Sequence, residues 1–472
     1  MKPPSSSSKI TKEWVQYIMQ DYMQKKHHLS STPDVTIKEF VVKEGASAGE
    51  GFNSEIVSLD VVAICSGDGA EGTSTDAEYH CIVKFFSTDT FSREANKRFE
   101  SHLREHAIYS ELIRDLNNFQ ALKTGNEFEI HIPELIYGMV SNKDFVLVME
   151  NVKVKGFNTN NRYSGLNFDQ LKEAVNQLAR LHAVSYAYNK SHNILKKFPF
   201  LKLNEEVVKV FESFCGVFID NGIALLNTKD DMKDLAKKIK ISKARLFSEF
   251  LKLYISSEDH ISCICHGDFW NNNILFKTQM QCDHGNETKL LCEVIDWGNA
   301  AWGLPILDLQ YLIYTSTAIE IRKEHLESVL HLYYSAFIDI TTKLEVPVPN
   351  WSYDNFQKEW QRLSVFGFLM GIALTQGTLS KSNPVNKPRE ASLLDHSVCL
   401  PIKLVVDGVK LGTVKALTPL LFKVPASKLM IAMNRKLFQP IREEILSGKN
   451  EVLNKRIIDL MLEADEKGIF SE

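Results

Sequence analysis

Two short segments in the middle of the chain place carboxylate, amide and imidazole side chains at close spacing. The first, CHGDFWNNNILF, runs from Cys265 to Phe276, and the second, EVIDWGNAAWG, runs from Glu293 to Gly303. Phosphoryl transfer needs such groups: a carboxylate beside the acceptor hydroxyl, oxygen ligands for Mg²⁺ and cations on the phosphates. Asp268 can accept the acceptor proton. We assign His266 to the same catalytic loop, where we expect it to bind backbone and fix the loop.

A divalent cation is the second requirement of this chemistry. Asn273 follows Asp268 by five residues and begins an expected strand, while Asp296 ends the opposing strand. Because a hairpin returns the chain to the same end, we expect Asp268, Asn273 and Asp296 to converge on one Mg²⁺, which prefers oxygen ligands. The competing interpretation is a buried Asp–His–Asn cluster that only holds the hairpin together. Both segments occurring in order, at hairpin spacing, favours the metal site.

The elements that position these residues form a strand-rich part and then a helix-rich part. Helices are expected at 10–25 and 92–117, and strands at 41–43, 56–64, 79–86, 132–137 and 145–150, with a polar loop at 66–78. Beyond residue 150 helices dominate, the clearest beginning at the N-cap Asn167 with Gln170 three residues on. Two strands, at 273–276 and 290–295, interrupt them.

The fold class predicted from this order is α+β with two lobes. Residues 1–150 form a small antiparallel β-rich lobe, and residues 151–472 form a larger, mostly helical lobe. A cleft between the lobes is the expected place for a ligand. Residues near 376–430 contain several prolines and predict an irregular or hairpin insert.

Composition disfavours several classes of protein. The chain has 55 Lys plus Arg against 59 Asp plus Glu, without the basic excess of nucleic-acid or membrane-surface binders. The N-terminal segment lacks the apolar core of a secretory signal. The longest apolar stretch, 365–374, is far shorter than the roughly 20 residues that span a bilayer. We therefore expect a cytoplasmic protein with reduced cysteines, and the irregular Cys and His spacing between 263 and 292 disfavours structural zinc.

The HGDFWNNNILF block followed by EVIDWG resembles the catalytic and metal-binding loops of the aminoglycoside phosphotransferase and choline kinase superfamily. More narrowly, the chain resembles the ecdysteroid kinase-like (CHK kinase-like) family. The segments that carry this narrower resemblance are GEGFNS (Gly49–Ser54), REHAIY (Arg104–Tyr109), LVMENVKVKGF (Leu147–Phe157), LARLHA (Leu178–Ala183), GLPILDLQYLIY (Gly303–Tyr314) and RIIDLMLEADEKGIF (Arg456–Phe470). They span most of the chain and imply a two-lobed, protein-kinase-like fold.

The resemblance also implies a nucleotide site in the N-terminal lobe. Lys84, in the strand at 79–86, matches the lysine that contacts the ATP α- and β-phosphates, and Glu105 matches its ion-pair partner. Glycine lets backbone N–H groups approach phosphate closely. The turn that matches the phosphate-covering loop contains Gly49, Gly51 and Ser54.

Further matches concern the hinge and the catalytic loop. The segment that matches the adenine-binding hinge contains Met149, Glu150 and Asn151. Asp308 matches the aspartate that braces the catalytic loop; the other interpretation is a helix N-cap ahead of LQYLIY. Gly267 stands where protein kinases carry arginine, and only about a dozen residues separate Asp296 from Asp308. That segment is too short for an activation loop, so a protein substrate is disfavoured.

The implied function is transfer of the ATP γ-phosphate, with Mg²⁺, to a hydroxyl of a small, lipophilic, ecdysteroid-like alcohol. A choline, ethanolamine or aminoglycoside kinase is an alternative, as is a catalytically silent kinase fold that binds a small ligand. The intact catalytic set disfavours the silent protein. We expect a small-molecule alcohol as partner, with no nucleic acid and no membrane insertion; the oligomeric state is not predicted. The aromatic residues that could line an apolar acceptor pocket, or simply fill the core, are Trp270, Trp297, Trp302, Phe366 and Phe368.

Overall fold

The computed structural model describes residues 1–44, 54–66, 74–87, 93, 96–202, 205–254, 261–280, 288–383 and 434–471. The chain divides into two compact units. Unit 1 comprises Met1–Asp115, His131–Asn158 and Glu293–Gly298, and unit 2 comprises Leu116–Ile130, Thr159–Cys292 and Asn299–Glu472. Compared with the expected boundary at residue 150, the segment 116–130 falls in unit 2 and the segment 293–298 falls in unit 1.

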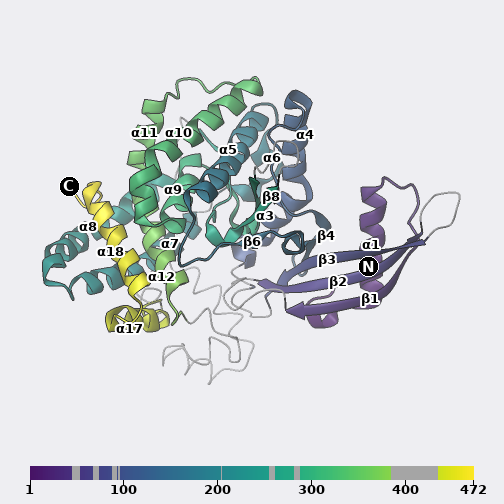
Figure 1. Ribbon diagram of the computed structural model, residues 1–472, viewed down its shortest axis with the longest axis horizontal. Coiled ribbons are helices and arrows are strands. Elements are labelled where there is room, and N and C mark those ends of the chain that lie inside the picture. Colours follow the sequence, from purple (N-terminus) through teal and green to yellow (C-terminus); the bar gives the residue numbers. More distant parts are fainter. Residues whose placement is uncertain are drawn as a thin grey trace. The chain divides into compact units, whose positions relative to one another are not determined.

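The sheet of unit 1 has five antiparallel strands in the order β1-β2-β3-β5-β4. Figure 1 labels β1, β2, β3 and β4 of this sheet. The strands are β1 (Val35–Glu44), β2 (Ser54–Ser66), β3 (Ser74–Phe86), β4 (Leu135–Val140) and β5 (Phe145–Glu150). The expected antiparallel sheet is therefore confirmed. The expected loop at 66–78 is wrong at its end, because β3 already begins at Ser74, where it pairs with Ser66 and extends the β2–β3 ladder.

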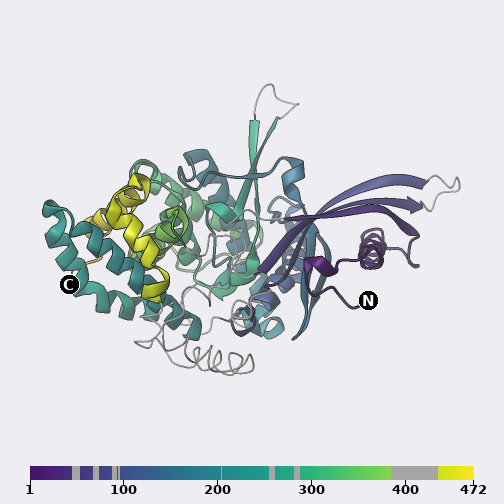
Figure 2. The same cartoon turned by 90° about the horizontal axis from the view of Figure 1, so that it is seen from below.

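Helix α1 (Lys12–Lys26) covers one face of this sheet (Figure 2). It begins at Thr11, whose side chain accepts a hydrogen bond from the backbone of Trp14. Apolar residues of α1 at helical spacing pack on alternate residues of β2 and β3, among them Leu59 and Val83. Because side chains alternate along a strand, Lys84 points to the face of the sheet that α1 does not cover.

The expected helix at 92–117 is interrupted. Glu100 adopts a left-handed conformation, with φ of 55°, and this backbone geometry breaks a right-handed helix. After it come α3 (Ser101–Ala107), a π-helical turn (Ile108–Leu112) and α4 (Ile113–Thr124). Glu105 lies in α3 and is buried.

Unit 2 is mainly helical (Figure 1). Its first long helix, α5, begins with a complete capping box between Asn167 and Gln170, as predicted. Residues 376–379, where the insert was expected to start, instead continue the buried helix α12, and residues 384–433 lie outside the described residues. The helices are α5 (Phe168–Ser191), α6 (Ile194–Lys197), α7 (Glu205–Leu226), α8 (Lys233–Tyr254), α9 (Pro305–Ser316), α10 (Ile319–Lys343), α11 (Tyr353–Arg362), α12 (Ser364–Leu379), α17 (Gln439–Ser447) and α18 (Glu451–Glu466).

Short strands frame the two motif segments. β8 (Ile274–Met280) and β9 (Thr288–Val294) are neighbours in a small sheet with β6 (Asn158–Thr159), which confirms the expected strand pair. A second pair, β7 (Cys263–Cys265) with β10 (Ala301–Gly303), was not expected from the sequence. β7 leads into the HGD loop, and the antiparallel pairing sets Cys265, the last residue before the loop, opposite Ala301 at the start of β10.

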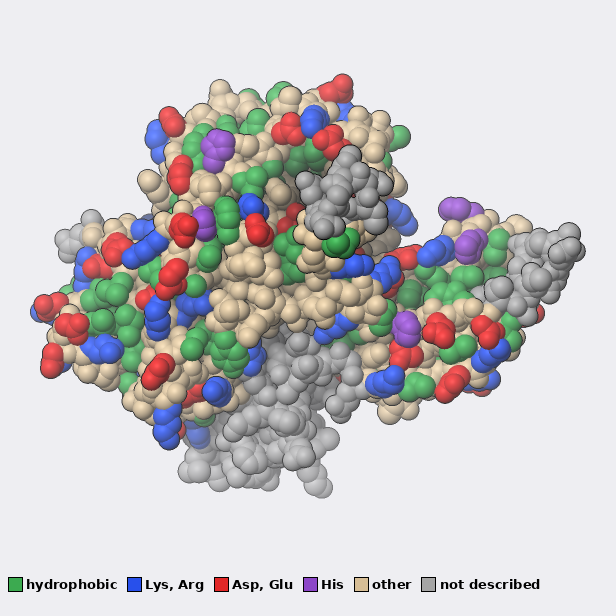
Figure 3. Space-filling view, in the orientation of Figure 1, with side chains coloured by type: hydrophobic (Ala, Val, Ile, Leu, Met, Phe, Trp, Pro, Cys, Tyr) green, Lys and Arg blue, Asp and Glu red, His purple; other side chains and the backbone are tan. Residues whose placement is uncertain are grey.

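The surface in Figure 3 carries basic and acidic side chains interspersed, in agreement with the net charge of −4. Within the part of the chain that the structure describes, no single helix is long and apolar enough to cross a membrane. Taken together, α11 and α12 reach that length and composition, with a bend of 50° between them.

Candidate active site

The loop between β7 and β8 carries Asp268. Gly267, just before it, has φ of 77°, and a Cβ atom at this position would lie 2.2 Å from the carbonyl oxygen of Asn299. An L-amino acid side chain would therefore be both conformationally strained and in steric conflict here. A short 3₁₀ turn, Asn271–Asn273, then leads into β8. The glycine of HGD thus follows from the geometry of the loop.

Both carboxylate oxygens of Asp268 accept hydrogen bonds. The hydroxyl of Tyr311 donates to Oδ1 over 2.5 Å, and Nδ2 of Asn273 donates to Oδ2 over 3.0 Å and to the Asp268 carbonyl over 2.9 Å. These contacts hold the carboxylate in one orientation. Since the amide nitrogen of Asn273 serves Asp268, its amide oxygen points elsewhere and can bind a different group.

Asp308 joins α9 to this loop. Its Oδ2 accepts from the backbone N–H of His266 over 2.5 Å, and its Oδ1 accepts from that of Gly267 over 2.9 Å. The alternative N-cap interpretation is wrong, because α9 begins at Pro305 with Leu304 as its N-cap, which leaves Asp308 inside the helix. Buried carboxylate hydrogen bonds of this kind are costly to break. Nδ1 of His266 accepts from the backbone N–H of Asp268 over 3.2 Å, so the ring holds loop backbone.

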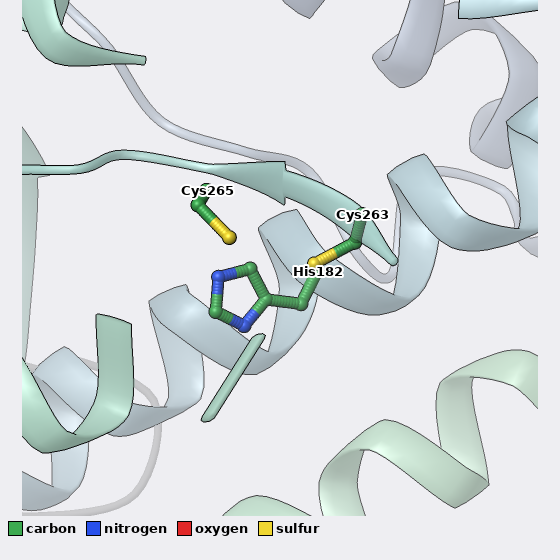
Figure 4. A group of neighbouring side chains, drawn as sticks. All are labelled: His182, Cys263 and Cys265. Carbon is green, nitrogen blue, oxygen red and sulfur yellow. The ribbon is translucent and has the colours of Figure 1, made fainter. Parts of the chain in front are cut away.

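A buried cluster behind the loop contains His182 of α5 with Cys263 and Cys265 of β7 (Figure 4). A ring nitrogen of His182 and the two cysteine sulfur atoms, which could all be metal ligands, lie within 4.8 Å of one another. Both ring nitrogens of His182 already have partners, Nδ1 with the Tyr333 hydroxyl at 2.8 Å and Nε2 with Asp308 Oδ2 at 3.3 Å.

The charge of His182 is set by these neighbours. Burial disfavours the imidazolium, but the hydrogen bonds with Asp308 and Cys265 outweigh it and raise the pKa of His182 to about 9. Burial also raises the pKa of Cys263, which keeps its thiol protonated. We interpret the cluster as support for Asp308 and the loop. Sequence reasoning noted His182 only within LARLHA, and its contact partners lie far away in the sequence.

In unit 1, Lys84 joins two carboxylates. Its Nζ lies 2.7 Å from Oε1 of Glu105 and 2.7 Å from Oδ1 of Asp296. The Lys84 and Glu105 side chains are almost fully buried, whereas that of Asp296 is 44% exposed. Burial disfavours the ammonium, but Asp296 and Glu105 together hold the pKa of Lys84 above its ordinary value. Burial raises the pKa of Glu105 to about 7, although the charge of Lys84 opposes the shift.

The backbone of Asp296 is strained. Its φ is 65°, a left-handed conformation that non-glycine residues adopt rarely and that aspartate tolerates better than most. A 3₁₀ turn, Trp297–Asn299, follows it directly. The conformation presents a half-exposed carboxylate just beyond the end of β9, and strain of this kind is concentrated at functional sites.

The residues expected in the phosphate-covering turn and in the adenine-binding hinge lie in or next to the strands of unit 1 where the structure describes them. Ser54 is buried and begins β2, while Gly49 and Gly51 lie outside the described residues. Met149 and Glu150 end β5. The hinge expectation concerned backbone groups, and the N–H of Asn151 is bonded to the carbonyl of His80 over 2.8 Å. That N–H group is therefore already used within unit 1.

Most of the expected pocket aromatics are core residues. Trp297, Phe366 and Phe368 are at most 3% exposed. Their burial matches the alternative that the sequence left open, an ordinary core. Trp270 differs, because it lines a small polar pocket next to the loop.

An antiparallel sheet with a buried Lys–Glu pair, followed by a helical unit whose HGD loop is braced by an aspartate, defines a protein-kinase-like fold of the phosphotransferase class. The model of the ecdysteroid kinase-like family matches residues 48–346, more than half of the chain, and the protein belongs to this family. No curated protein matches the sequence significantly.

Solved structures to which the chain is similar include three aminoglycoside phosphotransferases. An aminoglycoside-3'-phosphotransferase of type VIII is 13% identical with a TM-score of 0.30, covering 76% of this chain and 99% of its own. A GDP complex of aminoglycoside 2'-phosphotransferase-IIIa is 13% identical with a TM-score of 0.32, covering 77% and 94%. An enzyme from Streptomyces rimosus in complex with ADP and streptomycin is 12% identical with a TM-score of 0.22, covering 66% and 90%.

Proposed function

We propose that this protein transfers the γ-phosphate of ATP to a hydroxyl group of a small molecule. Membership of the ecdysteroid kinase-like family supports a small-molecule kinase. The observation that carries the proposal is the environment of Asp268, whose carboxylate is oriented by Tyr311 and Asn273 on a loop braced by Asp308. Such positioning is the main contribution that a protein makes to phosphoryl transfer.

In this proposal Asp268 is the general base. It accepts the proton of the acceptor hydroxyl as that oxygen attacks phosphorus. Tyr311 and Asn273 keep the carboxylate in one rotamer, so no reorganisation is needed when the acceptor binds. Asp308 acts indirectly, because it fixes the backbone of His266 and Gly267.

ATP and Mg²⁺ fit the other residues. The half-exposed carboxylate of Asp296 and the amide oxygen of Asn273 are the proposed metal ligands, since oxygen donors suit a hard cation. Lys84, kept charged by Glu105, is the proposed contact to the α- and β-phosphates. Bound ATP would supply the phosphoryl group, and bound Mg²⁺ would neutralise negative charge on the ATP phosphates. Gly49, Gly51 and Ser54 remain the proposed phosphate-covering turn, and Met149 to Asn151 the proposed hinge.

The acceptor is proposed to be an alcohol of ecdysteroid-like type, on the strength of the family alone. Nothing among the described residues favours choline or ethanolamine over it. The cytoplasmic location also remains a prediction from the sequence.

A phosphate-transfer screen tests the proposal. Purified protein is incubated with γ-³²P-ATP, Mg²⁺ and separate sterols, choline analogues and aminoglycosides, and labelled products are resolved by chromatography. We expect a labelled acceptor that is absent with Asp268→Asn and present with Asp234→Asn, which changes an aspartate in the first turn of α8. Label transfer that persists with Asp268→Asn would remove Asp268 from the role of base.

A further inference from the structure

A small polar pocket lies beside the proposed catalytic loop, entirely within unit 2. Its volume is about 10 Å³, room for about one water-sized group. The residues of its lining that matter here are Arg162, Arg456, Trp270, Asn271, Ser316 and Thr375. Trp270 and Asn271 follow Asp268 by two and three residues. The pocket is too small for a steroid ring, but one polar group of a larger ligand can enter it.

Arg456, on α18, brings to this pocket a buried cation that has no ion-pair partner among the described residues. It is 8% exposed, and its guanidinium donates to the carbonyl of Thr317 over 2.9 Å and to that of Tyr163 over 3.5 Å. Among the described residues no carboxylate lies within ion-pair distance of it. The charges of Glu320 and Asp459 favour the Arg456 cation, but both carboxylates form their ion pairs with Lys455.

The contact with Thr317 compensates Arg456 only in part. Thr317 is the C-cap of α9, where the helix dipole favours cations. Arg322 donates to the same carbonyl over 2.6 Å, and its charge is met by Glu463 at 2.7 Å. Burial, followed by repulsion from Arg322, lowers the pKa of Arg456. A buried cation without a counter-charge is costly, and a bound anion would remove that cost.

Two further side chains point to a ligand. Arg162 also lines the pocket, where its guanidinium stacks on Tyr163 at 5.3 Å, and it forms no ion pair with a described residue. Asn271 is 2% exposed, and its Oδ1 is buried without a hydrogen-bond partner among the described residues. Its Nδ2 donates to the carbonyl of Asn160 over 3.2 Å, which fixes the amide orientation. The free oxygen calls for a donor, such as a hydroxyl next to the anion.

We propose that this pocket receives one oxygen of an oxyanion group, a carboxylate, sulfate or phosphate, that belongs to the acceptor molecule and whose remainder lies outside the pocket. The two guanidinium groups pair with the anion, and Asn271 accepts from an adjacent hydroxyl of the same molecule. This inference rests on the proposed kinase function and refines it, because the preferred acceptor becomes an anionic alcohol rather than a neutral one.

The first test measures anion binding without turnover. Thermal unfolding is followed in rising sodium sulfate and in sodium chloride of equal ionic strength. The background is the double variant Lys84→Met/Glu105→Gln, which removes binding at the proposed ATP phosphate site without leaving Glu105 buried and unpaired. We expect a saturable rise of the melting temperature, of at least 2 °C, with sulfate alone. Arg162→Gln and Arg456→Lys should each weaken the apparent sulfate affinity at least tenfold. Arg435→Gln, at an exposed arginine that pairs with Asp220, should leave it unchanged.

Arg162 is partly exposed, so Arg162→Gln keeps the test valid even if the buried Arg456 variant fails to fold. No sulfate-specific rise in the Lys84→Met/Glu105→Gln protein would overturn the site. A rise that both arginine variants retain would also overturn it.

The second test compares matched acceptors, each neutral alcohol with its carboxylate, sulfate or phosphate counterpart, by label transfer from ATP. Wild type should use an anionic member at least tenfold better in kcat/KM, and Arg162→Gln should erase the preference. Equal use of the pairs would overturn the acceptor assignment. Specific sulfate binding without transfer to any acceptor would leave the anion site standing while contradicting the kinase proposal, so the two failures are distinguishable.

Discussion

The hydroxyl of Tyr311 donates a hydrogen bond to Oδ1 of Asp268 over 2.5 Å. The two residues lie 43 positions apart, and the contact links the HGD loop directly to α9. Asp308, on the same helix three residues earlier, holds the backbone of that loop. α9 therefore controls both the position of the loop and the orientation of the proposed base.

We expect Tyr311→Phe to lower kcat about tenfold, because the Asp268 carboxylate loses one of the two donors that fix its rotamer. The KM for ATP should stay within a factor of about two. Steady-state kinetics at saturating acceptor measure both constants. Tyr314→Phe, one turn further along α9, removes a hydroxyl that contacts Lys467 instead and should leave kcat unchanged. An unaltered kcat for Tyr311→Phe would show that the contact does not position the base.

Gly267→Ala should distort the catalytic loop. The added Cβ would lie 2.2 Å from a backbone oxygen at a φ of 77°, so the loop must shift, and a displacement near 1 Å can lower kcat about 100-fold. Gly448→Ala is the matched control, because Gly448 has a φ of 72° with open space around it. That variant should lose about 1 kcal/mol of stability and no activity. Comparable activity in both variants would contradict the steric argument.

Replacing Lys84 should impair nucleotide use. Lys84→Met alone leaves Glu105 buried without its partner, so the double variant Lys84→Met/Glu105→Gln is the better test of function. We expect its kcat/KM for ATP to fall at least about 100-fold, with a cooperative unfolding transition retained. Lys38→Met, at an exposed lysine of β1 that pairs with Asp76, should match wild type. Kinetics of the double variant close to wild type would exclude Lys84 from the nucleotide site.

Glu293 should make stability depend on pH. Burial and the nearby Glu150 raise its pKa from 4.5 to about 7. The folded state thus keeps a proton that the unfolded state releases, and stability falls as pH rises through this window. Glu293→Gln is neutral at every pH. It should therefore match wild type near pH 4.5 and exceed it at pH 8 by on the order of 1 kcal/mol, since the group is partly exposed.

Urea unfolding at both pH values measures this difference in stability. Glu39→Gln, at an exposed glutamate of β1, is the control and should show no such pH dependence. A stability difference between wild type and Glu293→Gln that is the same at both pH values would contradict the assignment.

Local patterns predicted much of the fold. β-branched content with partial alternation located β2, and the strands expected at 79–86 and 145–150 match β3 and β5. The Asn167–Gln170 pair marked the start of α5, because helix capping depends on residues close in the sequence. Sequence reasoning missed the β7–β10 pair and the break at Glu100. The pair joins segments more than thirty residues apart, and the break reflects a backbone angle that the residue type does not disclose.

In the candidate site, too, local sequence predicted some features, and contacts between distant segments determined the others. The residue types and spacing of HGD and IDWG predicted Asp268, Asn273 and Asp296 as candidates. The Tyr311 and His182 contacts escaped prediction, because they depend on which face of α9 or α5 packs on the loop. Spacing offered one clue to Tyr311, since it follows Asp308 by three residues and so lies on the same helical face. Arg456 gave no such signal, because its pocket is assembled from distant segments.

The proposed mechanism requires one cation shared by Asn273 and Asp296, and Mn²⁺ binding tests this requirement directly. Free Mn²⁺ is measured by electron paramagnetic resonance while protein is titrated in the presence of a non-hydrolysable ATP analogue. We predict that wild type takes up Mn²⁺ only with nucleotide and that Asn273→Ala and Asp296→Ala each weaken uptake at least tenfold, whereas Asn272→Ala does not. Nucleotide-dependent Mn²⁺ uptake of wild-type strength in both the Asn273 and Asp296 variants would contradict the proposal.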